Sequence, residues 1–493
     1  MITSIAVLPL KSLSDDPNHE YLADGLTDSI TSELAKIRSL KVISNTSAVR
    51  YKNTDLTMPE IAKALGVDGL IEGSLFREGN DVRITVQLIH GPSDAHVWSE
   101  SYTGTVTSIM QLQSEVALAI ADALGAKLTG DERSRIASAQ EVDPEAYDAY
   151  VIGNHYLNQL TEDGLNTAIR YFEKAVNIDP EYAHAWGGMV CAYWEMAAHG
   201  LGRPREIYPK ARSAGMRALQ LNADMSTDQS HMGMIAMGYD HEWDQAEERF
   251  QFALRFAPSN SFALHDYARF LSFVGRDEEA LQYALVAEDL DPMPTLLAPY
   301  LARETIRIES DPQRARRNME QLRAANPEFL QALDTLTRVY RTLAMPEDAL
   351  GAADEWVELS GRDAPSLTSL ALTLGAAGQD ERARIVLEEI AAKDDYFDSA
   401  AVGYAYVSLD DLDAAFEWLE KGYDSRDWGI TRLRTIPYWK IYIDTPSWIR
   451  FRNDPRYRDL IERVGFPPLP PEHPGYAEEQ AWLGRKARVE DQK

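Results

Sequence analysis

Strand-like and helix-like hydrophobic patterns alternate over the first 130 residues. The apolar run SIAVLPL predicts a short strand, and the segment 21–37 repeats apolar residues at steps of three and four, as an amphipathic helix does. LKVIS predicts a second strand, and MPEIAKALG predicts a short helix with proline in its first turn and glycine at its end. The chain is therefore expected to begin with alternating strands and helices.

Three more strand patterns and one helix pattern complete this region. DGLIEGSLF and DVRITVQLI are joined by REGN, whose Gly79 and Asn80 are typical of a hairpin turn, so the two strands should be antiparallel neighbours. AHVWSESY predicts another strand, and residues 108–124 predict a helix that covers the sheet. We therefore expect an α/β domain with a mixed sheet and helices at 1–130.

From about residue 143 the pattern is helical throughout, and it repeats. A small residue is followed four positions later by an apolar residue and three positions after that by another. Pro258, Pro292 and Pro327 stand 34 and 35 residues apart. The small residues that open the triplets are Ala168, Ala246, Ala280, Ala315, Ala349, Ala383 and Ala415. Because such residues let paired helices approach closely, we expect an all-α solenoid of about eight repeats at 146–425.

A linker at 131–145 and two C-terminal segments complete the expected division. Residues 426–466 are rich in aromatic side chains, which predicts a cap over the apolar face of the last repeat, with an aromatic recognition patch as the alternative. Residues 467–493 form a proline-rich and charged tail that opens with PPLPPEHPGY. This composition predicts an extended linker or a peptide that partners recognise.

Two parts of the chain resemble known families. IAVLPL, EYLADGLTDSITSELAKIRSLKVIS, ALGVDGLIEGSLFREGNDVRITVQLI and AHVWSESY, in that order, resemble the TolB-like amino-terminal domain found beside tetratricopeptide repeat (TPR) arrays in bacterial signalling proteins. Leu10 departs from it, since an aromatic residue is usual there. NIDPEYAHAW, EEALQYALVAEDLDP and AAFEWLEKGY resemble TPR units.

These resemblances imply a right-handed superhelical solenoid after the α/β domain. They also imply a signalling context, because such regions commonly lie downstream of a class III adenylate cyclase, a winged-helix DNA-binding domain or a protein kinase, often across a membrane span. None of those modules is recognisable in this sequence.

The charge of the chain narrows the choice of partner. Lys and Arg number 49 against 78 Asp and Glu, a net charge of −29, and most of the acidic excess lies after residue 140. An acidic surface repels phosphate backbones and favours basic or neutral partners, so nucleic acid is not an expected partner. No signal-peptide pattern and no long apolar run is present. We expect a cytoplasmic protein, or a periplasmic one if an upstream membrane anchor is missing.

Motifs for catalysis, cofactors and metals are missing from the sequence. It contains no Gly-x-Ser-x-Gly, His-Glu-x-x-His, Cys-x-x-Cys or Gly-x-Gly-x-x-Gly. Asp15, Asp16 and Asp24 lack the spacing and the closing glutamate of a calcium loop, so a turn before a helix explains them better. No catalytic residue, cofactor or metal is therefore expected.

One histidine and methionine cluster leaves an alternative open. HMGMIAMGYDH places His231 three residues before Met234 and Met237 four before His241, a set that could suit copper. We favour core packing, because methionine fills uneven gaps between helices. The single cysteine, Cys191, cannot form an internal disulfide, and it is expected to be a small buried residue.

The sequence therefore predicts a non-catalytic scaffold or sensor that binds a protein or peptide on the concave face of its solenoid. Alternatives are the regulatory region of a receptor whose effector domain is absent, an oligomerisation scaffold, and an enzyme that uses an acid between Asp15 and Asp28. Acidic residues of the first helices of the repeats suggest a basic or amphipathic peptide. The candidate partner-binding residues are Asp148, Glu195, Asp228, Asp266, Glu304 and Asp334.

Overall fold

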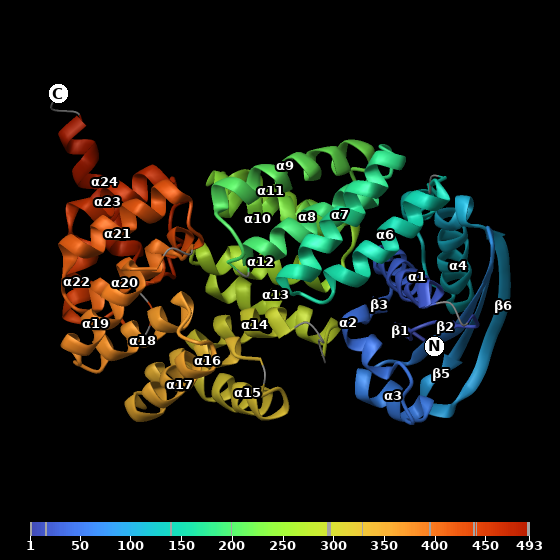
Figure 1. Ribbon diagram of the computed structural model, residues 1–493, viewed down its shortest axis with the longest axis horizontal. Helices are drawn as coiled ribbons and strands as arrows, with labels where there is room; N and C mark the ends of the chain where they lie inside the picture. Colours follow the sequence, from blue (N-terminus) through green and yellow to red (C-terminus); the bar gives the residue numbers. More distant parts are fainter. Residues whose placement is uncertain are drawn as a thin grey trace.

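A small sheet with its helices lies at one end of the molecule, and a helical array extends from it to the other end (Figure 1). The computed structural model describes residues 2–14, 17–138, 141–198, 200–292, 297–327, 329–393, 396–436, 439 and 441–490. A mixed sheet followed by helices was expected, and this order is confirmed. In the described residues no helix is both long and apolar enough to span a membrane.

The sheet joins a parallel part to an antiparallel part. Its strands are β1 (Ser4–Val7), β2 (Lys11–Ser12), β3 (Lys41–Val42), β4 (Gly69–Glu78), β5 (Asp81–His90) and β6 (Ala95–Thr105). The order is β3-β1-β4-β5-β6; β1 is parallel to β3 and β4, whereas β5 is antiparallel to both β4 and β6. Glu78 pairs with Asp81, so Gly79 and Asn80 form the two-residue turn that REGN predicted.

Side chains alternate across β1, and both faces of this strand are buried. Ile5 and Val7 join the core formed with α1 and α4, whereas Ala6 and Leu8 join a smaller core with α3. The helices of this region are α1 (Pro17–Ala35), α2 (Asn45–Ala48), α3 (Met58–Leu65), α4 (Ile109–Leu124) and α5 (Gly130–Ile136). The amphipathic pattern at 21–37 thus forms α1, whose apolar stripe faces the sheet.

The segment predicted as a linker at 131–145 is partly helical. Helix α5 occupies its first residues, and Ile136 on this helix is 1% exposed and belongs to the main core. The backbone N–H of Arg38 donates to Glu132 at 3.1 Å. Helix α5 is therefore packed against the α/β region.

Eight consecutive helix pairs follow among the described residues. The first helices of the pairs are α6 (Pro144–Leu157), α8 (Ala183–Ala198), α10 (Ser226–Ile235), α12 (Ser261–Phe273), α14 (Leu297–Ser310), α16 (Gln331–Thr342), α18 (Ala364–Ala376) and α20 (Ser399–Ser408). The second helices are α7 (Glu162–Ile178), α9 (Pro204–Leu221), α11 (Trp243–Phe256), α13 (Asp277–Leu290), α15 (Pro312–Ala325), α17 (Pro346–Leu359), α19 (Asp380–Ala391) and α21 (Leu412–Ser425). Each helix packs mainly on its partner and on its neighbours in the chain, as in a solenoid.

The small residues of the repeat pattern lie where helices touch. Every alanine that opened a triplet is fully buried on the second helix of its pair. Phe172, four residues after one of these alanines, packs against glycines of the two adjacent first helices. A Cβ at Gly153 or Gly188 would stand 2.6 Å from its ring. The spacing of small and large residues therefore reflects how the side chains of adjacent helices pack against one another.

The chain after α21 turns back on the middle of the array. It contains η5 (Trp428–Arg432), α22 (Pro446–Asn453), α23 (Pro455–Val464) and α24 (Tyr476–Glu490). The ring of Trp428 lies edge-on to Trp194 of α8 at 5.6 Å, and Trp243 Nε1 donates to the Val464 carbonyl at 3.1 Å. The segment at 426–466 therefore contacts α8 and α11 as well as the last helix pair. The tail was expected to be extended, but 476–490 is helical.

Candidate functional site

A cavity of about 2320 Å³ runs along the inner side of the array. All eight first helices line it, from Tyr150 on α6 to Tyr404 on α20, and second helices contribute few residues. On α12 the lining side chains recur one turn apart, at His265, Arg269 and Phe273. The first helix of each pair thus presents one face to the cavity, which is where a solenoid binds.

Four of the six candidate acids line this cavity: Glu195, Asp228, Asp266 and Asp334. Two of them are held by serine hydroxyls of an adjacent first helix. Ser230 Oγ donates to Asp266 at 2.8 Å, and Ser369 Oγ donates to Asp334 at 3.0 Å. These hydrogen bonds fix the direction in which the carboxylates present their charge.

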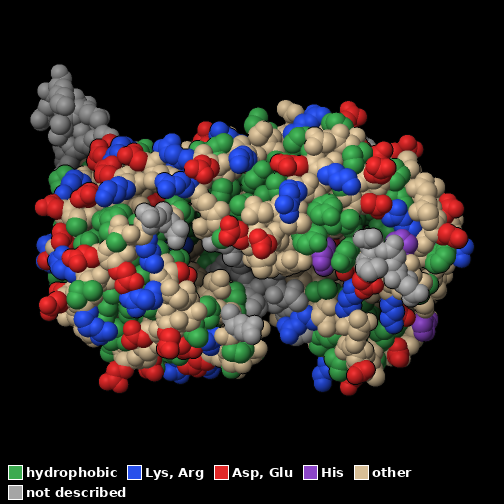
Figure 2. Space-filling view, in the orientation of Figure 1, with side chains coloured by type: hydrophobic (Ala, Val, Ile, Leu, Met, Phe, Trp, Pro, Cys, Tyr) green, Lys and Arg blue, Asp and Glu red, His purple; other side chains and the backbone are tan. Residues whose placement is uncertain are grey.

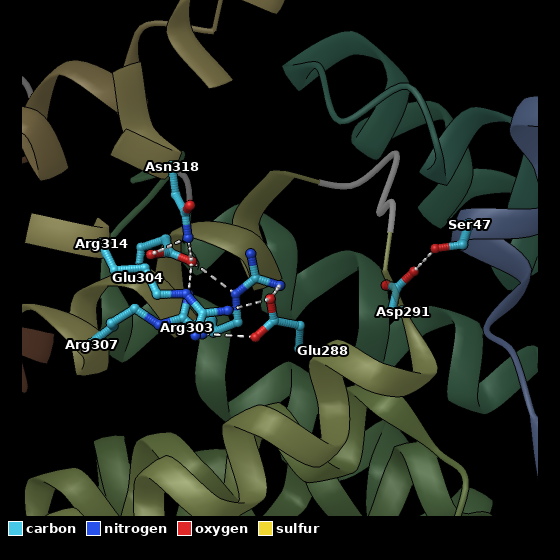
Figure 3. A network of polar contacts seen from close by, with 8 residues as sticks. All are labelled: Ser47, Glu288, Asp291, Arg303, Glu304, Arg307, Arg314 and Asn318. Atoms are coloured by element: carbon cyan, nitrogen blue, oxygen red, sulfur yellow. Dashed lines mark hydrogen bonds and ion pairs between the residues drawn. The ribbon is translucent and has the colours of Figure 1, made fainter. Parts of the chain in front are cut away.

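The other two candidates take part in ion pairs. Asp148 accepts two hydrogen bonds from Arg77 of β4, at 2.5 and 2.9 Å, and so joins α6 to the sheet. Glu304 is fully buried in a polar network on α13, α14 and α15 (Figure 3). The members of this network are Glu288, Arg303, Glu304, Arg307, Arg314 and Asn318. Neither acid is among the residues that line the cavity.

Asp228 has the most constrained carboxyl group of the four cavity acids. Its side chain packs against Gly187 of α8, where a Cβ would stand 2.7 Å from Oδ1. Asp228 is 4% exposed, and its Oδ1 has no hydrogen-bond partner in the described part of the chain. Burial raises the pKa of Asp228 to about 7. This carboxyl is therefore close to half protonated at neutral pH.

Cys191 and His231 form a neighbouring pair on α8 and α10. The Cys191 Sγ lies 3.5 Å from His231 Nδ1. Burial raises the pKa of the Cys191 thiol well above its usual value and lowers the pKa of the His231 imidazole. Burial therefore favours a neutral thiol beside a neutral imidazole. A thiol in this state is a poor nucleophile.

The histidine and methionine cluster is divided between the main core and the contact with the C-terminal segment. Met234 and Met237 are fully buried in the main core, where packing was expected. His241 ends a π-helix, η4 (Ala236–Asp240), and lies 2.8 Å from Arg426 Nη1. Among the described residues no group of three His, Cys, Asp or Glu could hold a metal ion.

Helix α1 contributes a wall of the cavity that sequence reasoning missed. Asp28 lines the cavity, and solvent in the cavity reaches its side chain. The surrounding protein atoms desolvate the carboxyl group and raise its pKa. Asn45 Nδ2 donates to Asp28 at 3.3 Å. Asp24 also lines the cavity and pairs with Lys52 at 2.6 Å, whereas Asp15 and Asp16 lie outside the described residues. Only the amphipathic pattern of this helix was visible in the sequence.

The α/β region is fastened to the array by the start of α2. Thr46 Oγ1 and Ser47 Oγ donate to Asp291 at 2.6 and 2.5 Å, and the Ser44 N–H donates to the Leu290 carbonyl at 2.8 Å (Figure 3). Asp291 is 2% exposed and ends α13. Because α6 and α13 both contact the α/β region, the first half of the array curves around it.

Acidic side chains outnumber basic ones along the described lining of the cavity. On the outer face in view in Figure 2, acidic and basic side chains are interspersed. A concave wall with one predominant sign of charge concentrates counter-charged ligands. The arrangement can therefore hold a cationic segment.

Comparison with known proteins found a relative by sequence and several solved structures with low TM-scores. No family model matches the chain. A protein of Rhizobium meliloti (strain 1021) named "Putative adenylate cyclase 3" is 33% identical over 246 residues, which are 50% of this chain and 42% of that protein. The match thus covers less than half of the relative.

The solved structures share low sequence identity with the chain. A tetratricopeptide repeat protein from Parabacteroides merdae ATCC 43184 matches at 11% identity and a TM-score of 0.38, over 55% of this chain and 99% of that one. A chain of the APC/C hetero-tetramer Cut9-Hcn1 matches at 14% identity and a TM-score of 0.41, over 72% of this chain and 67% of that one. PilW, a type IV pilus biogenesis factor, matches at 15% and 0.29, over 51% and 94%. TM-scores this low do not establish a shared fold. The repeat architecture is therefore inferred from the helix pairs described above.

Proposed function

We propose that this chain is a non-catalytic scaffold or sensor of a bacterial signalling system, which binds a basic or amphipathic protein segment in the cavity of its TPR array. The observation that carries the proposal is the cavity of about 2320 Å³ lined by the first helices, with its acidic excess. Its volume is several times that of a small-ligand pocket, roughly 300–1,000 Å³, so it has room for a peptide.

The electrostatics of the lining support a cationic partner. Asp266 and Asp334 keep their carboxylates in place through serine hydroxyls, so little side-chain conformational freedom is lost when a partner binds. A low-dielectric wall on each side focuses their field into the cavity. Charge complementarity of this kind speeds association and selects partners, and it weakens as salt is added.

A second candidate is the regulatory region of a larger receptor with a cyclase or transcription-regulator effector. The relative named as an adenylate cyclase favours it, because the match covers 42% of that protein and leaves room for other modules. In this reading residues 1–130 are a TolB-like domain and 146–425 the TPR solenoid. The contact of Asp291 with α2 would then transmit a change from the array to the α/β domain.

The test uses the full chain as bait in a bacterial lysate, followed by titration of the purified captured partner at two salt concentrations. The double variant Asp266→Asn, Asp334→Asn should weaken binding about tenfold and flatten its salt dependence. Asp354→Asn on the outer helix α17, an exposed acid, is the matched control and should change neither. Equal effects of the two changes, or binding that ignores salt, would contradict the proposal.

A further inference from the structure

Two arginine side chains from distant parts of the chain lie near one another on the cavity wall, because Arg432 stands over the ring of Phe273, one turn after Arg269 on α12. Arg269 lies on α12 in the middle of the array, and Arg432 ends η5 in the returning C-terminal segment. Both line the cavity and both are half-buried. Burial is the main cause that lowers the pKa of Arg269, and the charge of Asp266 partly opposes it. The positive charge of Arg432 lowers the pKa of Arg269 further, as expected for two guanidinium groups that repel each other.

Neither guanidinium has a hydrogen-bond acceptor among the residues that the structure describes. In the described part of the chain, Arg269 and Arg432 donate no side-chain hydrogen bond and form no ion pair within 4.0 Å. The Nε of Arg432 is buried without a partner. A guanidinium has five N–H donors, and unmet donors in a partly dry environment are costly. An anionic acceptor that reaches both guanidinium groups would satisfy their N–H donors and would offset the repulsion between their charges.

The neighbouring carboxylates already have donors of their own. Asp266 accepts the hydroxyl of Ser230, and Asp398 accepts the backbone N–H groups of Ala401 and Gly429 at 3.1 and 2.7 Å. Burial raises the pKa of Asp398 and of Asp427, and the charge of Asp398 raises that of Asp427 further. These carboxyls therefore hold less negative charge near Arg432 than two free aspartates would.

Aromatic rings surround the two arginines. Trp428 lies between Trp194 and Phe273, with ring centroids at 5.6 and 5.9 Å, and Tyr208 lies 6.2 Å from Trp194. Arg432 stands over the Phe273 ring at 5.7 Å. All four rings line the cavity. An apolar wall beside two unmatched cations suits a ligand with a flat apolar body and an anionic end.

We propose that Arg269 and Arg432 clamp the oxyanion, a carboxylate or a phosphate, of an aromatic ligand that packs against the cavity-facing side of the Trp194, Tyr208, Phe273 and Trp428 cluster. Guanidinium forks match both kinds of oxyanion with paired hydrogen bonds. Only a small part of the cavity is needed, so the site goes beyond the proposed scaffold function and does not depend on a protein partner. A ligand of this site must carry an oxyanion, whereas the acidic excess of the lining favours a cationic partner.

The experiment titrates the full chain with phenylacetate, phenyl phosphate and the neutral phenylacetamide, each by calorimetry and by intrinsic tryptophan fluorescence. At least one oxyanion should bind about tenfold or more tightly than phenylacetamide. Phenylacetate alone identifies a carboxylate ligand, phenyl phosphate alone a phosphate, and both together a general oxyanion site. Arg269→Gln and Arg432→Gln should each weaken that binding about tenfold.

Controls separate binding from folding. Arg255→Gln, an exposed arginine on the outer side of α11, should bind like the unchanged chain. Arg269→Lys keeps the positive charge but loses the paired N–H donors of the guanidinium, so its affinity should lie between those of the unchanged chain and Arg269→Gln. If thermal unfolding shows that Arg269→Gln is misfolded, Arg269→Lys takes its place in the test. Equal binding of phenylacetamide, full binding by the Gln variants, or no binding at millimolar oxyanion would overturn the proposal. The scaffold function would be unaffected, because its test reads the acids at 266 and 334.

Discussion

Asp228 is expected to make the folded protein less stable as pH rises from mildly acidic to mildly basic values. Its carboxyl is 4% exposed, packs on Gly187, and has an Oδ1 without a hydrogen-bond partner among the described residues. Burial raises its pKa from 3.8 to about 7. Between these two values the folded protein holds a proton that the unfolded chain has lost.

The sign and the size of the effect follow from that difference. Because the folded state binds more protons, the free energy of unfolding falls as pH rises through this window, and below about pH 4 the effect vanishes. Each pH unit is worth about 1.4 kcal/mol, so the loss approaches ~4 kcal/mol above pH 7. Between about pH 5.5 and about pH 8 it amounts to ~2 kcal/mol.

Asp228→Asn removes this titration and keeps the shape of the side chain. The free energy of unfolding of the variant, minus that of the unchanged chain, should therefore grow by ~2 kcal/mol between about pH 5.5 and about pH 8. Urea unfolding followed by tryptophan fluorescence measures both chains at each pH. Any pH-independent cost of the buried amide cancels in this comparison.

Asp354→Asn, an exposed acid on α17, is the control and should give the same difference at both pH values. If the Asp228→Asn difference also stays constant with pH, then Asp228 is ionised in the folded protein. The carboxylate would in that case be stabilised by a donor, and the argument from burial would be refuted.

Three further changes test the packing that builds the cavity. Asp291→Ala removes the acceptor of two hydroxyl groups of α2 and should lower the free energy of unfolding by ~2 kcal/mol, measured by urea unfolding. Gly238→Ala should cost ~1–3 kcal/mol in the same assay and expose 426–466 to limited proteolysis, because the new Cβ would stand 2.2 Å from the Trp428 ring. A fragment 1–142 should melt at a higher temperature than 1–130, since Ile136 on α5 contributes ~2 kcal/mol of apolar burial.

Each of these changes has a matched comparison. Asp289→Ala, two residues from Asp291, breaks only an exposed pair with Lys41 and should cost less than ~1 kcal/mol. Gly351→Ala, on α17 with nothing within 4 Å of the new Cβ, should stabilise the chain by ~0.5–1 kcal/mol. Equal costs for Asp289 and Asp291, or for the two glycines, would contradict the contacts described. Equal melting of the two fragments would place α5 outside the α/β domain.

The sequence by itself determined the elements and their pairing. Alanines at a spacing near 34 residues marked the second helices, and they are fully buried where those helices meet the first ones. The REGN turn fixed the pairing of β4 with β5, and the stripe at 21–37 defined α1. These features are readable because they depend on contacts between residues close in the chain.

Only the tertiary structure decided what those elements enclose. Asp228 and Glu304 both occupy first helices, yet one lines the cavity and the other lies in an arginine network. Arg269 and Arg432 lie near one another, and α1 forms a wall, because small rotations between successive helix pairs accumulate until the array curves around the α/β region and the C-terminal segment returns to its middle. That curvature is a sum over the whole array, so no local pattern in the sequence specifies it.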